Sequence, residues 1–364
     1  MTSDAKNERW VGKLLRSIGS LAVAVLVLEG LARLDDAVTW GAPFWGPYSY
    51  EVLNLFDERG VSSVRGRPGA RYQKWQQNAL GFRGPEVSKD KPPGVKRVFL
   101  AGASEIFGLQ ESPGNELPAQ LQRELDRRRP GRYQVINAGR AGLSPPRFPH
   151  YFRSWLRQLD PDVIVYYPTP HFYLDEIPPS FTVPAEKRPR APRHLPRIVE
   201  KAKTLLRQAT PPALRMQLNR LSLHLRRRGH GPDWVWREVP AERVARYRAH
   251  LAAIVEAVRE DTRVELQLCL HANRFPRELT RLDERQLLAL EVEYPRASPR
   301  ALLEIDGAIN RVTREVAAAR GLPLIDLQGK LGKRPELYAD FSHFTDRGAA
   351  EAAGIIADAL LQGR

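Results

Sequence analysis

The sequence predicts an α/β fold, a three-layer sandwich in which a five-stranded parallel sheet lies between two layers of helices. Three observations lead to this prediction. Five short apolar runs rich in β-branched residues are typical of strands that are covered on both faces. Helical patterns separate these runs, and such alternation favours a parallel sheet with right-handed crossovers. The length of 364 residues allows one large domain with accessory segments.

The individual elements follow from the spacing of the apolar residues. The predicted strands cover residues 97–101, 133–137, 163–167, 264–270 and 322–326. The predicted helices cover residues 117–129, 147–159, 241–260, 300–320 and 345–361. Pro118 supports the first of these helices, because proline is favoured in the first turn.

The N-terminal region predicts a membrane anchor. Residues 17–28 carry no charge, and the apolar character resumes after Glu29, so we expect one span over residues 14–33. Basic residues precede the run, which places residues 1–13 in the cytoplasm by the positive-inside rule. Trp10, Trp40 and Trp45 suit the two membrane interfaces. A cleaved signal peptide and a buried helix of a soluble protein are the alternatives, but no small-x-small cleavage site directly follows the apolar core.

With this anchor, the rest of the chain is expected outside the cytoplasm, in the periplasm where the cell has an outer membrane. Residues 34–95 are rich in Gly, Pro and aromatic residues, and we interpret them as a linker and a lead-in to a main domain at 96–364. A stretch at about 175–238 interrupts the strand–helix alternation and is rich in arginine. Four interpretations stay open for this insertion: a solvated helical excursion, a lid, a surface for anionic lipid, or a dock for acidic polysaccharide.

Composition excludes several classes of function. The net charge is +15, but the basic residues are spread along the chain and no nucleic-acid-binding motif is present, so we expect no nucleic-acid partner. Cys269 is the only cysteine, which rules out an intrachain disulfide. No His/Cys cluster has zinc-ligand spacing and no glycine-rich phosphate loop is present, so neither a metal nor a cofactor is expected.

Polar residues with catalytic potential follow the predicted strands. Ser104 comes directly after the first strand, and Asp340 and His343 stand three residues apart after the last one. A serine, a histidine and an aspartate are the attacker, the general base and the orienter of the base in a nucleophilic hydrolase. In a parallel α/β sheet ligands bind beyond the carboxyl ends of the strands, where these residues are expected. Each could also be an ordinary polar loop residue.

Four segments together resemble the SGNH (GDSL-like) hydrolases, a family of esterases, deacetylases and acyltransferases. They are residues 78–84, 98–104, 135–142 and 340–343. The resemblance implies a flavodoxin-like sheet, a catalytic Ser104, and Asp340 and His343 as its partners. It also implies that the backbone N–H groups of Ser104 and Gly142 form the oxyanion hole. Residues 78–84 are similar to the lead-in of membrane-anchored bacterial members.

The chain departs from the family pattern in two blocks. The first block usually reads Gly-Asp-Ser, and here Ala103 stands in place of the aspartate. The third block usually supplies an asparagine to the oxyanion hole, and here Pro170 occupies that position. Proline offers neither a side-chain donor nor an N–H. His171 and Asn273 are the candidate replacement donors, and we favour His171 because it lies on the same loop.

The resemblance and the predicted location imply a function. The expected activity is hydrolysis of an O-acyl ester, on a glycan or another polymer of the cell envelope, through an acyl-enzyme on Ser104. An O-acyltransferase would use the same three residues and is the first alternative. The second alternative is a catalytically inactive member that binds glycan or scaffolds an envelope assembly, which the loss of the block-three asparagine favours.

Overall fold

The structure, a computed structural model, describes residues 4–40, 44–45, 55–57, 63–183, 196–276 and 278–362. Its centre is a five-stranded sheet in the order β4-β3-β5-β6-β7, in which all neighbouring strands are parallel. This is the strand order of flavodoxin-like doubly wound sheets. The strands are β3 Lys96–Gly102, β4 Tyr133–Gly139, β5 Val163–Tyr166, β6 Glu265–Cys269 and β7 Leu324–Ile325. The predicted fold class is confirmed.

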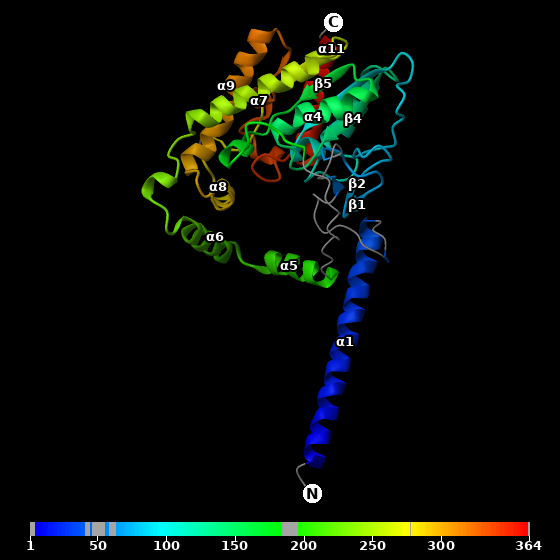
Figure 1. Ribbon diagram of the computed structural model, residues 1–364, viewed down its shortest axis with the longest axis vertical. Coiled ribbons are helices and arrows are strands. Elements are labelled where there is room, and N and C mark those ends of the chain that lie inside the picture. Colours follow the sequence, from blue (N-terminus) through cyan, green and yellow to red (C-terminus); the bar gives the residue numbers. More distant parts are fainter. Residues whose placement is uncertain are drawn as a thin grey trace.

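Helices cover both faces of the sheet, as the alternating side chains of β3 show. Val98 and Leu100 belong to one buried cluster with residues of α3 and α11, whereas Phe99 and Ala101 belong to another with residues of α4, α7 and α9. The chain therefore forms three layers (Figure 1). The bounds are α3 Leu117–Arg128, α4 Phe148–Ser154, α7 Ala241–Arg259, α9 Pro299–Arg320 and α11 Asp346–Gln362.

Some elements differ from the sequence expectation. The helix expected at 147–159 is broken at Trp155, whose backbone is not helical, into α4 and the 3-10 turn Leu156–Leu159. Helix α8, Arg281–Glu293, was not expected, although Thr280 and Asp283 form a capping box at its start. Three short elements were also not expected: α2 Ser104–Phe107, α10 Leu327–Leu331 and the hairpin of β1 Arg71–Tyr72 with β2 Trp75–Gln76.

The lead-in braces the turn that follows β3. Phe82 packs edge-on against Phe99, with ring centroids 6.0 Å apart. The Arg83 guanidinium donates to the Phe107 carbonyl over 3.0 Å and pairs with Glu116 at 3.4 Å, and both side chains are buried. Residues 41–43, 46–54 and 58–62 of the expected linker lie outside the described residues.

The N-terminal helix α1, Asp4–Trp40, extends away from the main domain (Figure 1). Its segment Gly12–Thr39 is long and apolar enough to cross a membrane, and none of its most apolar window is buried in the protein. Two helices of the insertion, α5 Arg197–Ala209 and α6 Pro212–Arg227, run across the end of the domain from which α1 projects. Residues 184–195 of the insertion lie outside the described residues.

Candidate active site

The turn that carries Ser104 depends on close backbone contacts. β3 ends at Gly102, and Ser104 opens the short helix α2. A Cβ on Gly102 would lie 2.9 Å from the Tyr167 carbonyl oxygen and 2.7 Å from Ile106. A Cβ on Gly139 would overlap the Phe107 backbone nitrogen. Glycines at both positions therefore allow α2 to sit tightly on the ends of β4 and β5, which fixes the place of the serine.

The structure brings Ser104, His343 and Asp340 into one hydrogen-bonded chain. The Ser104 Oγ lies 2.9 Å from His343 Nε2. His343 Nδ1 lies 2.8 Å from Asp340 Oδ2, and Asp340 Oδ1 accepts the backbone N–H groups of Ser342 and His343. The carboxylate therefore holds both the loop and the imidazole ring. This contact between residues 239 positions apart is the geometry that a nucleophile and its base require.

The surroundings of His343 favour its charged form. Burial lowers the pKa of His343, but the hydrogen bond and charge of Asp340 outweigh it, and the charges of Glu105 and Glu111 add to the effect. The result is a pKa of about 9. Burial raises the pKa of Asp340, whereas its hydrogen bonds from His343 lower it to a net value below the usual range. A general base must be neutral, so a base with the pKa of His343 would act most readily at alkaline pH.

Two backbone N–H groups are available where the oxyanion hole was expected. Gly142 lies in the turn after β4 with a φ of 75°, a conformation that favours glycine. The N–H of Ser104 is the first of α2 and has no partner within that helix. Among the hydrogen bonds of the described residues, neither the Ser104 N–H nor the Gly142 N–H has an acceptor. Both groups therefore remain free to donate to a substrate oxygen.

The two candidate replacement donors have different surroundings. His171 follows Pro170 in the 3-10 turn Pro170–Leu174, and its buried ring packs edge-on against Phe341 with centroids 4.5 Å apart. Burial lowers the pKa of His171 to about 4, so the ring is neutral and has one N–H group that can donate. Asn273 is already engaged, because its Oδ1 accepts the Phe275 N–H at 3.1 Å and its side chain hydrogen-bonds Asp306.

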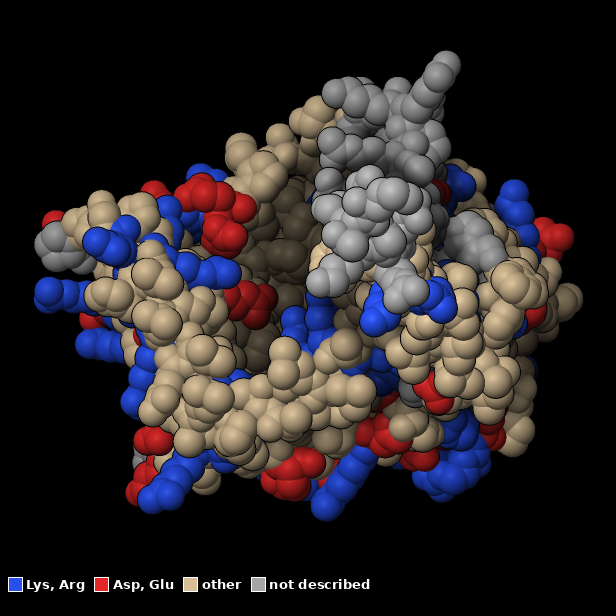
Figure 2. Space-filling model, turned by 90° about the horizontal axis from the view of Figure 1, so that it is seen from below, with Lys and Arg blue, Asp and Glu red and all other residues tan. Residues whose placement is uncertain are grey.

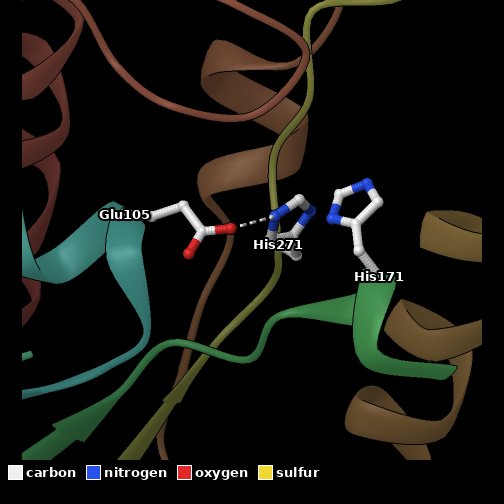
Figure 3. A group of neighbouring side chains, drawn as sticks. All are labelled: Glu105, His171 and His271. Atoms are coloured by element: carbon white, nitrogen blue, oxygen red, sulfur yellow. Dashed lines mark ion pairs between the residues drawn. The ribbon is translucent and has the colours of Figure 1, made fainter. Parts of the chain in front are cut away.

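A second carboxylate–histidine arrangement, which was not predicted from the sequence, begins at Glu105, the residue after Ser104. The Glu105 carboxylate accepts from Thr169 Oγ1 at 3.1 Å and from Ser342 Oγ at 3.3 Å. Its Oε1 lies 3.6 Å from His271 Nε2, as Figure 3 shows, and His271 Nδ1 is hydrogen-bonded to Asp306. All three of Glu105, His271 and Asp306 are buried. We call these three residues the buried row.

The charges of the buried row alternate. Burial raises the pKa of Glu105, but the hydrogen bond and charge of His271 and the charge of His343 outweigh it, and the result is about 2. Burial lowers the pKa of His271, but Asp306 and Glu105 outweigh it, and the result is about 9. The order is therefore carboxylate, imidazolium, carboxylate. The His271 cation compensates the negative charge that Glu105 places beside Ser104.

The same region contains a set of groups that metals bind. Ligand atoms of Glu105, His171 and His271 all lie within 4.8 Å of one another, with His171 beyond His271 as seen from Glu105 (Figure 3). No metal was expected from the sequence, where these residues are far apart. Glutamate and histidine are zinc ligands. Glu105 also accepts from two hydroxyl groups, and His271 Nδ1 is already hydrogen-bonded to Asp306, whereas His271 Nε2 has no hydrogen-bond partner among the described residues.

The only sequence signal for the buried row was position. Glu105 directly follows the candidate nucleophile, and His271 directly follows the apolar run at 264–270. Both positions are at the carboxyl ends of strands, where functional side chains gather in such sheets. Asp306 lies inside α9, where nothing in the local pattern distinguishes it from a surface carboxylate.

Comparison with known proteins gives matches among solved structures only. The scan against protein-family models and the search of curated proteins found no match. A lipase/acylhydrolase from Enterococcus faecalis is 16% identical over 72% of this chain and 94% of its own, with a TM-score of 0.42. A variant of an acetyl-xylooligosaccharide esterase from Geobacillus is 14% identical over 73% of this chain and 93% of its own, with a TM-score of 0.41. A lipolytic protein of the G-D-S-L family from Desulfitobacterium hafniense is 11% identical over 72% of this chain and 99% of its own, with a TM-score of 0.37. Each of these is a distant structural similarity.

Proposed function

We propose that this chain is a serine esterase that hydrolyses O-acyl esters. The observation that carries the proposal is the hydrogen-bonded chain from Ser104 through His343 to Asp340, with contacts of 2.9 Å and 2.8 Å. The two free N–H groups of Ser104 and Gly142 at the carboxyl ends of β3 and β4 support it. A hydroxyl, a base and an oxyanion site are the parts that acyl transfer requires.

In this mechanism His343 Nε2 takes the proton of the Ser104 hydroxyl as the oxygen attacks the acyl carbonyl. Asp340 keeps the Nδ1 proton of the ring in place and stabilises the imidazolium that forms. The Ser104 and Gly142 N–H groups donate to the carbonyl oxygen as it becomes negative. His343 then returns the proton to the alcohol that leaves. In the second step His343 takes a proton from water as the water oxygen attacks the acyl-enzyme. It then returns this proton to the Ser104 oxygen, which leaves.

The proposed setting is the surface of a membrane, with the main domain outside the cytoplasm and α1 as the anchor. Support comes from the length and apolar character of Gly12–Thr39 and from the basic residues that precede the apolar run. The proposed substrate is an O-acylated glycan of the cell envelope, which follows from this setting and from the resemblance stated above. Transfer of the acyl group to another alcohol uses the same acyl-enzyme and differs only in the acceptor.

A fluorophosphonate probe, which reacts with activated serines, tests the proposal. We expect labelling at Ser104, identified by mass spectrometry of the labelled peptide, and none in Ser104→Ala. Ser342→Ala is the matched control, because Ser342 is also buried near the site but hydrogen-bonds Glu105 and not His343. Absence of labelling in the folded wild-type protein, together with no hydrolysis of any model acyl ester, would favour the non-catalytic glycan-binding alternative.

A further inference from the structure

Helix α5 has an apolar face that is largely exposed in the described structure, apart from the partly buried Ile198 at its start. Ile198, Val199, Ala202, Leu205, Leu206 and Ala209 recur at helical spacing and share this face. The exposed fractions of Leu205 and Leu206 are 64% and 70%. The charged residues of α5 occupy the other side of the helix, so the helix is strongly amphipathic.

Helix α6 continues this arrangement. It packs against α8 with the side that bears the buried Leu223. Arg227 lies on the same side and pairs with Glu291. Its guanidinium also donates to the Pro295 and Ala297 carbonyls. A row of four leucines lies on the opposite side, with exposed fractions between 46% and 55%. These residues are Leu214, Leu218, Leu221 and Leu225. The leucine row therefore points away from the body of the protein.

The flanks of both helices are basic. Residues 197–228 contain nine Lys and Arg and a single acidic residue, Glu200. Figure 2 views the molecule from the end to which α1 projects, and shows uncharged surface there with many Lys and Arg and some Asp and Glu side chains around it. An apolar face with basic borders suits the boundary between acyl chains and anionic headgroups.

Contacts with α1 fix the position of α5 along that helix. The Glu29 carboxylate accepts the Ile198 N–H at the start of α5 over 3.0 Å. Arg197 forms a buried ion pair with Asp36, and Lys201 pairs with Asp36 at 2.9 Å. The part of the candidate span on the N-terminal side of Glu29 begins at Gly12. Those 17 residues give a helix of about 25 Å, close to the roughly 30 Å of a hydrocarbon core.

We propose that α5 and α6 lie in the membrane surface beside α1, with their leucine faces in the boundary region of the bilayer and their basic borders on anionic headgroups. The proposal rests on α1 as the anchor, which is part of the proposed function, but not on esterase activity. Figure 1 shows α5 and α6 lying crosswise to α1. With α1 across a bilayer, these two helices would therefore run along its surface. The main domain is thereby held at two points rather than one.

Fluorescence quenching in vesicles tests the proposal with the full-length protein. Cys269, the only cysteine, is buried, so an environment-sensitive label reacts with a newly introduced exposed cysteine. Leu205→Cys and Leu218→Cys report on the two leucine faces. Gln208→Cys is the matched control on the polar face of α5, and Leu21→Cys reports on α1. The vesicles contain zwitterionic and anionic phospholipids, some with a spin label just below the headgroup.

We expect the labels at Leu205→Cys and Leu218→Cys to shift to shorter wavelength and to lose intensity in spin-labelled vesicles, whereas the label at Gln208→Cys stays water-like. If both leucine positions behave like Gln208→Cys while Leu21→Cys is shielded from water, the anchor stands and the surface proposal is wrong. If Leu21→Cys is itself exposed to water, the anchor fails and the surface proposal falls with it. Because the vesicles contain no other protein, a protein partner cannot produce the expected result.

Discussion

The site region contains two aspartate–histidine pairs that differ in what lies beyond the second ring nitrogen. In one pair Asp340 contacts Nδ1 of His343, and Nε2 faces the Ser104 hydroxyl. In the other, Asp306 contacts Nδ1 of His271, and Nε2 faces the Glu105 carboxylate. Both histidines have a pKa raised to about 9, in each case by carboxylates that outweigh burial.

The group that faces Nε2 decides whether the histidine of such a pair can act as a base or remains a cation. A hydroxyl can give its proton to a neutral ring, so His343 can cycle between two protonation states. A carboxylate with a pKa of about 2 has no proton to give, so His271 stays charged between its two anions. The His343 side chain is 12% exposed, whereas that of His271 is fully buried and exchanges no proton with solvent directly. We therefore propose that the first pair serves turnover and the second serves local stability.

The largest expected effect is the loss of ester turnover when the Asp340–His343 pair is changed. His343→Gln should lower turnover of a model acyl ester by about four orders of magnitude or more, because the base is lost while the rest of the site remains. Ser104→Ala should lose as much, since the two residues act as a unit. Steady-state kinetics and thermal unfolding of each variant check this. Unchanged turnover in His343→Gln would remove the base from the mechanism.

The next effect concerns stability. Asp306→Asn should lower the free energy of unfolding by about 3–5 kcal/mol, because it removes the carboxylate that pairs with the buried His271 cation. Urea denaturation at neutral pH measures the loss, and Asp340→Asn, whose partner is more exposed, should lose less. A loss for Asp306→Asn below that for Asp340→Asn would contradict the structural role of the buried row.

Because the pKa of His271 is raised, its contribution to the free energy of unfolding should depend on pH. A pKa raised on folding contributes stability that is fully present below the unfolded value of about 6.5 and is lost as pH rises through about 9. The stability difference between the wild type and His271→Gln should therefore shrink between these two pH values. Denaturation curves at several pH values provide the measurement, and a difference that does not change with pH would contradict the charged state of His271.

A smaller effect is expected at the replacement donor. If His171 donates to the oxyanion, His171→Ala should lower turnover by roughly tenfold with KM little changed, because the contact forms mainly in the transition state. Asn273→Ala should instead reduce stability through the lost contact with Asp306. Full turnover in His171→Ala would mean that the two backbone N–H groups suffice.

The smallest effect is a shift in the pH profile. kcat/KM should rise with pH toward about 9 as His343 loses its proton. Glu105→Gln and Glu111→Gln should each move the midpoint to lower pH, by about half a unit to one unit, since each removes a negative charge that favours the imidazolium. Glu116→Gln is the control, because Glu116 pairs with Arg83. A midpoint that stays in place in both test variants would show that Asp340 alone sets the pKa of His343.

The sheet was predictable because its strands are short and apolar on both sides, and the order of functional loops then follows from the parallel arrangement. The contact between Ser104, His343 and Asp340 was predictable because all three follow strands whose carboxyl ends meet at one edge of the sheet. The buried row was not, because its members are separated by 166 and 35 positions and each is an ordinary polar residue until the fold pairs it. Helix α8 was missed although its capping box is visible in the sequence.

The separation of Ser104 from its base has a consequence for biosynthesis. The two residues that must touch are 239 positions apart, with the nucleophile synthesised first. At about 5–20 residues per second the ribosome needs roughly 12–48 seconds to reach His343 after Ser104. During that interval the nascent chain carries a serine that has no partner to activate it. With Ser104 as the proposed nucleophile, catalytic competence would therefore arise only after β7 and the Asp340–His343 loop have joined the domain.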